Sequence, residues 1–193
     1  MKSICVFCGS SPGRHPEFLR AAKNLGQTLA SQKLRLVYGG ASVGLMGAVA
    51  DAVLENGGEV IGVIPEHLFS KEVAHQNLKD LRIVKSMHER KALMADLSDA
   101  FIALPGGFGT FEEFFEILTW SQLGLHRKPA GLLDVDDYYK ALMDLIKRGL
   151  DDEFIRPEHG DLVLRSTSAE DLLSKFRKWV PPALPKWMNK SQT

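Results

Sequence analysis

The sequence lacks the features that would tie it to a membrane or to a nucleic acid polymer. Lys plus Arg and Asp plus Glu each total 24 of its 193 residues, so no excess charge attracts nucleic acid or anionic lipid. No uncharged apolar run approaches the length that crosses a bilayer. Residues 1–9 also lack a charged segment followed by a long apolar core, so we predict no signal peptide and expect a cytoplasmic protein.

Cysteine is scarce, because Cys5 and Cys8 are the only two in the chain. Their C-x-x-C spacing falls inside an apolar run, residues 4–8, that is typical of a strand, where positions three apart point to opposite faces. Redox pairs normally open a helix, and zinc would need further ligands at a suitable spacing, whereas the six histidines are scattered. We therefore interpret both cysteines as buried structural thiols and predict no metal site.

Short apolar runs alternate with segments of helical periodicity along most of the chain. We expect strands at residues 2–9, 34–38, 59–64, 81–84, 100–104, 130–133 and 162–164, and helices at 16–32, from the glycine loop to about 56, 86–97, 111–123, 137–148 and 169–179. The alternation predicts a single α/β domain, residues 1–180, with a doubly wound parallel sheet and helices on both faces.

Two segments do not fit the alternation. Residues 66–80 are polar and have no clear period, so we expect them to form a flap over the site, and Glu72 within it has the local context of a solvated surface carboxylate. Residues 181–193 include Pro181, Pro182 and Pro185 and are expected to form an irregular C-terminal tail.

Residues 105–113, P-G-G-F-G-T-F-E-E, follow an expected strand and precede an expected helix. Gly106, Gly107 and Gly109 allow the backbone to approach an anion closely, and a helix N-terminus presents N–H groups to a phosphate. Glu113 is expected in the first helical turn, next to the bound group. An anion site beside a carboxylate indicates an enzyme that acts on a phosphorylated substrate.

The same stretch has a structural interpretation. Thr110 and Glu113 match a capping box, in which Thr110 caps the helix and Glu113 bonds back to the backbone of Thr110. In that case the two side chains stabilise a helix end and carry no chemistry.

Two other loops are candidate ligand contacts. The loop after the first strand contains Gly9 and Ser10, and a second strand–glycine loop–helix unit at residues 38–47 contains Gly40 and Met46. Ligands of parallel sheets lie beyond the carboxyl ends of the strands, where these loops fall. Close packing of strand against helix explains the glycines of residues 38–47 equally well.

Arg90 and Lys91 lie in the first half of the expected helix at 86–97. Cations at that end oppose the helix dipole, which favours negative charge there. Their position suggests a compensating anion, supplied by a ligand or by Glu113. The alternative is an exposed basic pair on the helix surface.

The expected helix at 111–123 is apolar around most of its circumference, which predicts burial on more than one side. A single face of a sheet would not cover it, so we expect a helix–helix contact in a dimer to cover the rest. Glu112, Glu116 and Thr119 recur at i, i+4 and i+7 and form one polar stripe, which we interpret as the lining of a cleft.

The motifs M-H-E-R-K (87–91) and P-G-G-F-G-T-F-E-E (105–113) together resemble the LONELY GUY (LOG) family of cytokinin riboside 5′-monophosphate phosphoribohydrolases, which are often labelled lysine decarboxylases. The agreement extends through C-V-F-C-G-S-S (5–11), Y-G-G-A-S-V-G-L-M-G (38–47), S-D-A-F-I-A-L (98–104) and T-W-S-Q-L-G (119–124). Every defined position of the family pattern P-G-G-x-G-T-x-x-E is matched. Phe111 stands where leucine is more usual, a change expected to affect packing and not chemistry.

The resemblance implies a Rossmann-like fold, a homodimer, no metal or redox cofactor, and hydrolysis of a nucleoside 5′-monophosphate to a free base and ribose 5-phosphate. It assigns Arg90 and Glu113 as the catalytic pair. Substrate-binding residues implied are Glu72, Arg90, Lys91, Gly106, Gly107, Phe108, Gly109, Thr110, Phe111, Glu112, Glu116 and Thr119, with possible further contacts from Gly9, Ser10, Gly40 and Met46.

Two rival functions are open at this point. A non-catalytic nucleotide or cofactor carrier on the same fold, comparable to molybdenum-cofactor carrier proteins, would keep the glycine turns without needing Arg90 and Glu113 together. A lysine decarboxylase is the weaker alternative, because it would normally require pyridoxal phosphate.

Overall fold

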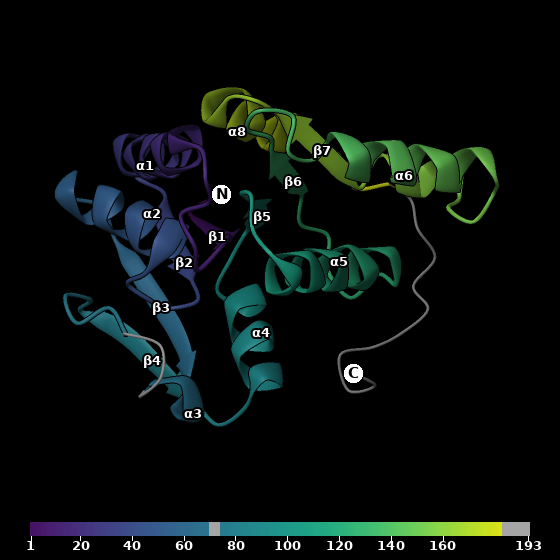
Figure 1. The fold of residues 1–193 in the computed structure, drawn as a ribbon. Coiled ribbons are helices and arrows are strands. Elements are labelled where there is room, and N and C mark those ends of the chain that lie inside the picture. Colours follow the sequence, from purple (N-terminus) through teal and green to yellow (C-terminus); the bar gives the residue numbers. More distant parts are fainter. Residues whose placement is uncertain (70–73, 183–193) are drawn as a thin grey trace.

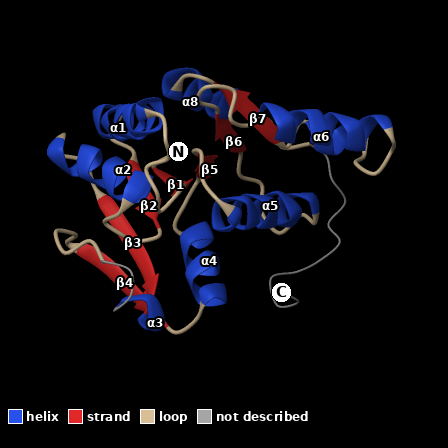
Figure 2. Cartoon of the chain, in the orientation of Figure 1, coloured by secondary structure: helices blue, strands red, loops and turns tan. Residues whose placement is uncertain are grey.

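A computed structural model describes residues 1–69 and 74–182 of the chain (Figures 1 and 2). The strands in these ranges are β1 (Ser3–Phe7), β2 (Arg35–Tyr38), β3 (Val60–Pro65), β4 (Asp80–Val84), β5 (Ala100–Ala103), β6 (Ala130–Leu133) and β7 (Val163–Ser166). The helices there are α1 (Pro16–Ser31), α2 (Gly44–Glu55), α3 (Glu66–Phe69), α4 (Met87–Asp96), α5 (Phe108–Gln122), α6 (Lys140–Asp151), α7 (Pro157–Gly160) and α8 (Ala169–Lys178).

The strands form one sheet in the order β4-β3-β2-β1-β5-β6-β7, and each neighbouring pair is parallel. The chain builds the sheet outward from β1 to β4, then returns to place β5 on the other side of β1. The order therefore reverses between β1 and β5. Parallel sheets bind their ligands at such a switch point, beyond the carboxyl ends of the strands.

Helices cover both faces of the sheet (Figure 1). One core cluster joins the sheet to α1, α2 and α8, and the other joins it to α4 and α5. Successive side chains of β1 point to opposite faces of the sheet, so this strand contributes to both clusters. Ile4 and Val6 belong to the first cluster, and Cys5 and Phe7 belong to the second. Each fully buried side chain of this size contributes roughly 1.5–3 kcal/mol to folding. The expected Rossmann-like α/β fold is confirmed.

Cys5 and Cys8 are both buried and free. They lie in opposite core clusters, as expected for strand positions three apart. Burial raises the pKa of both thiols, which keeps them protonated and unreactive.

The start of α5 differs from the expectation. The helix begins at Phe108, with Gly107 as its N-cap residue and no side-chain capping bond. Thr110 therefore lies inside the first turn, and the capping-box interpretation is wrong. Glu113 falls in the second turn and not in the first.

Three other segments differ in detail. Helix α6 begins at Lys140 and not at residue 137, because Asp136 and Asp137 have left-handed φ angles of 54° and 53° that a right-handed helix does not accept. The short helix α7 was not expected. Of the polar segment 66–80, residues 66–69 form α3, and residues 70–73, including Glu72, lie outside the described part of the chain.

The division into a domain of residues 1–180 and a tail of 181–193 stays a prediction, since residues 183–193 also lie outside the described ranges. Within residues 1–69 and 74–182, no helix is both long and apolar enough to span a bilayer.

Candidate functional site

A cavity of about 360 Å³ lies at the switch point, beyond the carboxyl ends of β1 and β5. Its walls come from the end of β1 and the loop after it, from the loop after β2, from the first turns of α2 and α5, and from α3 and α4. Of the residues expected at the site, those lining the cavity are Gly9, Ser10, Met46, Arg90, Gly107, Phe108, Gly109, Thr110, Glu112 and Glu113. The two motifs that are far apart in the sequence thus meet at one place.

The glycines of the 105–109 turn have different surroundings. A Cβ atom at Gly106 would lie 2.1 Å from Oγ1 of Thr110, so packing of the turn itself requires glycine there. A Cβ at Gly107 or Gly109 would meet no atom of residues 1–69 and 74–182 within 4 Å, and neither glycine has a positive φ. Packing within the described part of the chain does not explain these two glycines. They leave an open backbone surface at a helix N-terminus, which suits the close approach of an anion.

Arg90 is held inside the cavity wall. Ser86 caps α4 by accepting the N–H of Glu89 at 3.1 Å, which places Arg90 in the second turn of that helix. Arg90 is 6% exposed, and its Nη2 donates to the carbonyl of Gly39 at 3.1 Å. A Cβ at Gly39 would lie 1.9 Å from that nitrogen, so only glycine leaves room for the guanidinium.

The guanidinium keeps unused donor capacity. Its Nε is buried without a hydrogen-bond partner in the described residues, and Nη1 contacts only the weakly accepting sulfur of Met87 at 3.8 Å. Within residues 74–182, Arg90 and Glu113 form no ion pair. An anion that enters the cavity can therefore take up the free donor.

Glu113 is the titratable group at the centre of the site. Burial raises the pKa of its carboxyl to about 7, a rise that the Arg90 guanidinium opposes and the Glu112 carboxylate reinforces. Lys91 lowers the same pKa and Glu116 raises it, both to a smaller degree. A carboxyl group with a pKa near neutrality can both accept and return a proton at physiological pH.

Lys91 connects the two helices that carry Arg90 and Glu113. Its Nζ forms ion pairs with Glu112 and, at 2.9 Å, with Glu116 on α5. Burial alone would lower the pKa of Lys91, but these hydrogen bonds outweigh it and raise that pKa. Both Arg90 and Lys91 are buried, so the alternative of an exposed basic pair is wrong.

The remaining expected residues stand behind or beside the cavity. Among the described residues, Gly40, Lys91, Gly106, Phe111, Glu116 and Thr119 are not part of its lining. The Thr119 hydroxyl donates to the carbonyl of Phe115 at 2.8 Å on the outer side of α5. Of the predicted polar stripe, only Glu112 reaches the cavity.

Several lining residues were not expected: Val6, Phe7, Cys8, Gly39, Leu68, Met87 and Met94. Helical periodicity could have identified two of them. Met87 and Met94 lie three residues before and four residues after Arg90, which places all three on one face of α4.

The described residues of the chain leave the outer face of α5 open. Phe108 is 92% exposed and Phe115 is 40% exposed, while Phe114, Ile117 and Leu118 are buried against the sheet. The described residues of the chain therefore bury this helix on one side only.

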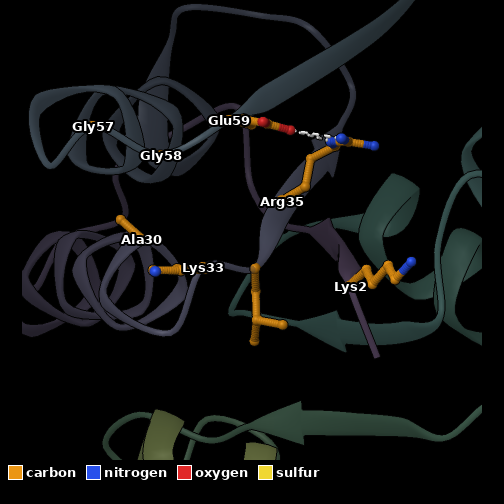
Figure 3. A pocket seen from close by; sticks show the side chains of 8 residues that line it. Lys2, Ala30, Lys33, Arg35, Gly57, Gly58 and Glu59 are labelled. Atoms are coloured by element: carbon orange, nitrogen blue, oxygen red, sulfur yellow. Dashed lines mark hydrogen bonds and ion pairs between the residues drawn. The ribbon is translucent and has the colours of Figure 1, made fainter.

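A second hollow, of about 470 Å³, lies at the opposite end of the strands, beside Lys2, Lys33 and Arg35 (Figure 3). Arg35 is already paired there with Glu59, at 2.6 Å. This end of the sheet carries the amino ends of β1 and β2, away from both glycine turns. We therefore place the candidate site in the cavity at the switch point.

The fold and the cavity together define an α/β protein with an open helix N-terminus and a carboxyl group of pKa about 7 at the switch point of a parallel sheet. The chain belongs to the family whose model is described as possible lysine decarboxylase, which matches residues 46–176. That range contains both motifs, 87–91 and 105–113.

Curated relatives match nearly the whole chain. A probable cytokinin riboside 5′-monophosphate phosphoribohydrolase of Oryza sativa subsp. japonica is 51% identical over 180 residues, which are 93% of this chain and 79% of the relative. Proteins named as the same enzyme are 51% identical in Rhodococcoides fascians (91% of this chain, 89% of the relative) and 47% identical in Arabidopsis thaliana (93% and 83%). The resemblance inferred from the motifs is confirmed.

Solved structures share the fold at low sequence identity. A molybdenum cofactor binding protein of Rippkaea orientalis superposes with a TM-score of 0.68 at 22% identity, covering 92% of this chain and 97% of that one. A molybdenum cofactor carrier protein of Chlamydomonas reinhardtii gives 0.67 at 20% identity, with 92% and 96% covered. At this identity the likeness supports the fold alone.

Proposed function

We propose that this protein is a cytokinin riboside 5′-monophosphate phosphoribohydrolase. It hydrolyses the N-glycosidic bond of an adenosine 5′-monophosphate, with or without an N6 substituent, and releases the free base and ribose 5-phosphate. The observation that carries the proposal is the meeting of Arg90, Glu113 and the open glycine turn in one cavity. Curated relatives that are 47–51% identical and are named for this activity support it.

Glu113 acts on the ribose. As the glycosidic bond lengthens, the ribose gains oxocarbenium character, which a facing carboxylate stabilises. The same carboxylate orients the attacking water and accepts its proton, while the departing base takes the bonding electrons and gains one proton to leave as the neutral free base. A pKa of about 7 supports this role, because the group is sufficiently basic to accept the proton of water as that water attacks.

Arg90 binds and does not transfer a proton, because a guanidinium stays protonated at all physiological pH values. Its buried, unpartnered Nε supports a contact with the phosphate or with a ribose hydroxyl. Its charge also favours the ionised form of Glu113.

The glycine turn binds the 5′-phosphate. The N–H groups at the start of α5 have no partner within the helix, and the backbone at Gly107 and Gly109 is open to the cavity. Phosphate binding remote from the reacting carbon positions the ribose, so an unphosphorylated nucleoside should react poorly.

Release of adenine from AMP tests the proposal directly. The wild type should liberate adenine and ribose 5-phosphate, and Glu113→Gln should lose at least about a hundredfold in kcat, the usual contribution of a general base. Hydrolysis by Glu113→Gln at the wild-type rate would contradict the role of the carboxylate.

A second variant separates the role of Arg90 in binding from a role in folding. Arg90→Ala should keep its fold, as judged by circular dichroism, while losing activity. An unfolded variant would indicate that the guanidinium is structural.

The two rival functions receive less support. A carrier protein would bind AMP without releasing adenine, and the solved carrier structures share only the fold with this chain. A lysine decarboxylase is opposed by the names of the curated relatives, although the family model keeps that description. Adding pyridoxal phosphate and lysine should therefore produce no carbon dioxide.

Further parts of the proposal concern assembly, surroundings and location. We propose a homodimer that covers the outer face of α5, supported by exposed Phe108 and Phe115. Glu72, Lys91, Glu116, Phe111 and Thr119 are proposed to complete the substrate site in the assembled enzyme, as the family resemblance implies. A cytoplasmic location is supported by the two free cysteines, since reducing compartments keep thiols unpaired.

A further inference from the structure

The loop between β6 and α6 is strained. Asp136 and Asp137 are consecutive residues with φ angles of 54° and 53°, a backbone region that side chains with a Cβ atom disfavour. Such outliers persist only where the surroundings hold them, and they cluster near functional sites. Contacts with the rest of the protein must therefore hold this loop in its conformation.

Buried polar contacts hold the strained loop in place. Asp134 is 0% exposed and accepts the N–H of Tyr139 at 2.9 Å and Nε of Arg165 at 2.7 Å. Arg165 also donates to Asp137 at 2.9 Å. A single guanidinium on β7 thus fixes both ends of the strained segment.

The loop delivers two tyrosine hydroxyls to the glycine turn. Tyr139 donates to the carbonyl of Leu104 at 2.6 Å, and Tyr138 donates to the carbonyl of Gly106. Between them, the carbonyl of Pro105 accepts the N–H of Gly9 at 3.1 Å. Three successive carbonyl groups, those of residues 104–106, are therefore held by donors from outside the turn.

Because the peptide group is planar, the hydrogen bond from Tyr138 to Gly106 also determines the direction of the next N–H group, that of Gly107. In a trans peptide the C=O of one residue and the N–H of the next point in opposite directions. Because Tyr138 holds the Gly106 carbonyl, the N–H of Gly107 points away from Tyr138, and Gly107 lines the cavity.

We propose that Tyr138 is a positioning residue that aims the Gly107 N–H at the phosphate of the substrate. The inference rests on the proposed function, because it assigns the anion at the glycine turn. Tyr138 is not among the described residues that line the cavity. It therefore acts through the peptide group between Gly106 and Gly107, whose carbonyl accepts its hydroxyl.

Tyr139 offers a matched control within the same loop. Its hydroxyl holds the Leu104 carbonyl, whose peptide plane leads to Pro105, a residue without an N–H. Loss of the Tyr139 hydroxyl leaves the buried carbonyl of Leu104 without its hydrogen bond, but it changes the direction of no N–H group at the site. Tyr139→Phe should therefore lower stability and leave phosphate affinity unchanged.

Tyr138→Phe removes only the hydroxyl. The ring stays in place because it packs edge-on against Phe18, with centroids 5.9 Å apart, and stacks on Phe111 at 6.5 Å. The variant should fold like the wild type, with an unaltered circular dichroism spectrum.

Calorimetric titration with ribose 5-phosphate tests the proposal without relying on turnover. Tyr138→Phe should bind it about tenfold more weakly than the wild type, because one hydrogen bond to a charged group is misdirected. Adenine should bind both proteins equally, and Tyr139→Phe should bind ribose 5-phosphate like the wild type. In steady-state assays, KM for AMP should rise about tenfold in Tyr138→Phe.

The outcomes separate this inference from the proposed function. Wild-type affinity in Tyr138→Phe would overturn the positioning role, and so would equal weakening in both tyrosine variants. A wild type that binds no ribose 5-phosphate would overturn the proposed function itself, and this inference with it.

Discussion

Replacing Glu113 should make the protein more stable and less active, with a gain in stability that grows from about pH 4.5 and is complete above about pH 7. Burial raises the pKa of this carboxyl from 4.5 to about 7. Between these two values the unfolded chain ionises Glu113 while the folded chain does not, so the free energy of unfolding falls as pH rises. Below pH 4.5 the group is protonated in both states and costs nothing.

The magnitude follows from the difference between the two pKa values. That difference is about 2.5 pH units, and at 1.36 kcal/mol per unit it amounts to roughly 3 kcal/mol above pH 7. Glu113→Gln removes this cost. Its free energy of unfolding should exceed that of the wild type by up to about 3 kcal/mol at pH 8 and by far less at pH 5.

Urea unfolding at the two pH values measures the effect. Glu112→Gln is the matched control, because it removes the adjacent charge of α5, which is exposed and paired with Lys91. That variant should lose up to about 1 kcal/mol at pH 5 and less at pH 8, because Glu112 raises the pKa of Glu113 and its removal relieves part of that cost where Glu113 is ionised. If Glu113→Gln differed from the wild type by the same amount at pH 5 and pH 8, the assignment of a neutral buried carboxyl would be refuted.

Three further predictions concern activity and binding. The value of kcat/KM should rise about tenfold per pH unit below pH 7 and level off above it, since the proposed mechanism requires Glu113 to be ionised; a flat profile between pH 5 and pH 8 would contradict this. Lys91→Met should move the rising part of this pH profile to higher pH, because Lys91 lowers the pKa of Glu113. Measuring kcat/KM of the variant across the same pH range checks the direction of the shift. Gly109→Ala should fold with up to about 1 kcal/mol of added helix stability yet bind ribose 5-phosphate at least tenfold more weakly, whereas Gly106→Ala should be destabilised; thermal unfolding and titration distinguish the two.

The sequence predicts the sheet and most helices because local pattern and tertiary packing agree in them. Fully apolar runs such as β5 and β6 are buried on both faces, and their limits are close to those expected. The start of α6 could not be predicted, because two aspartates adopt a left-handed backbone that Arg165 holds from another strand. Local propensity contains no information on such a contact.

The candidate site was only partly predictable. The two motifs identified Arg90 and Glu113, and the topology of a parallel sheet indicated where they would meet. The pairing of Lys91 with Glu112 and Glu116 depends on how α4 and α5 cross, which periodicity does not give. The contribution of Tyr138 was not expected, because a tyrosine after a strand has no pattern that distinguishes support of a neighbouring turn from ordinary packing.

The adjacency of β1 and β5 has a consequence for how the protein comes into being. Phe7 pairs with Ala103, so the loop with Gly9 meets the glycine turn only after about a hundred intervening residues have been placed. Closing so long a loop is entropically costly and slow. On the ribosome, the proposed site therefore assembles late, and no fragment that ends before residue 113 contains all of it.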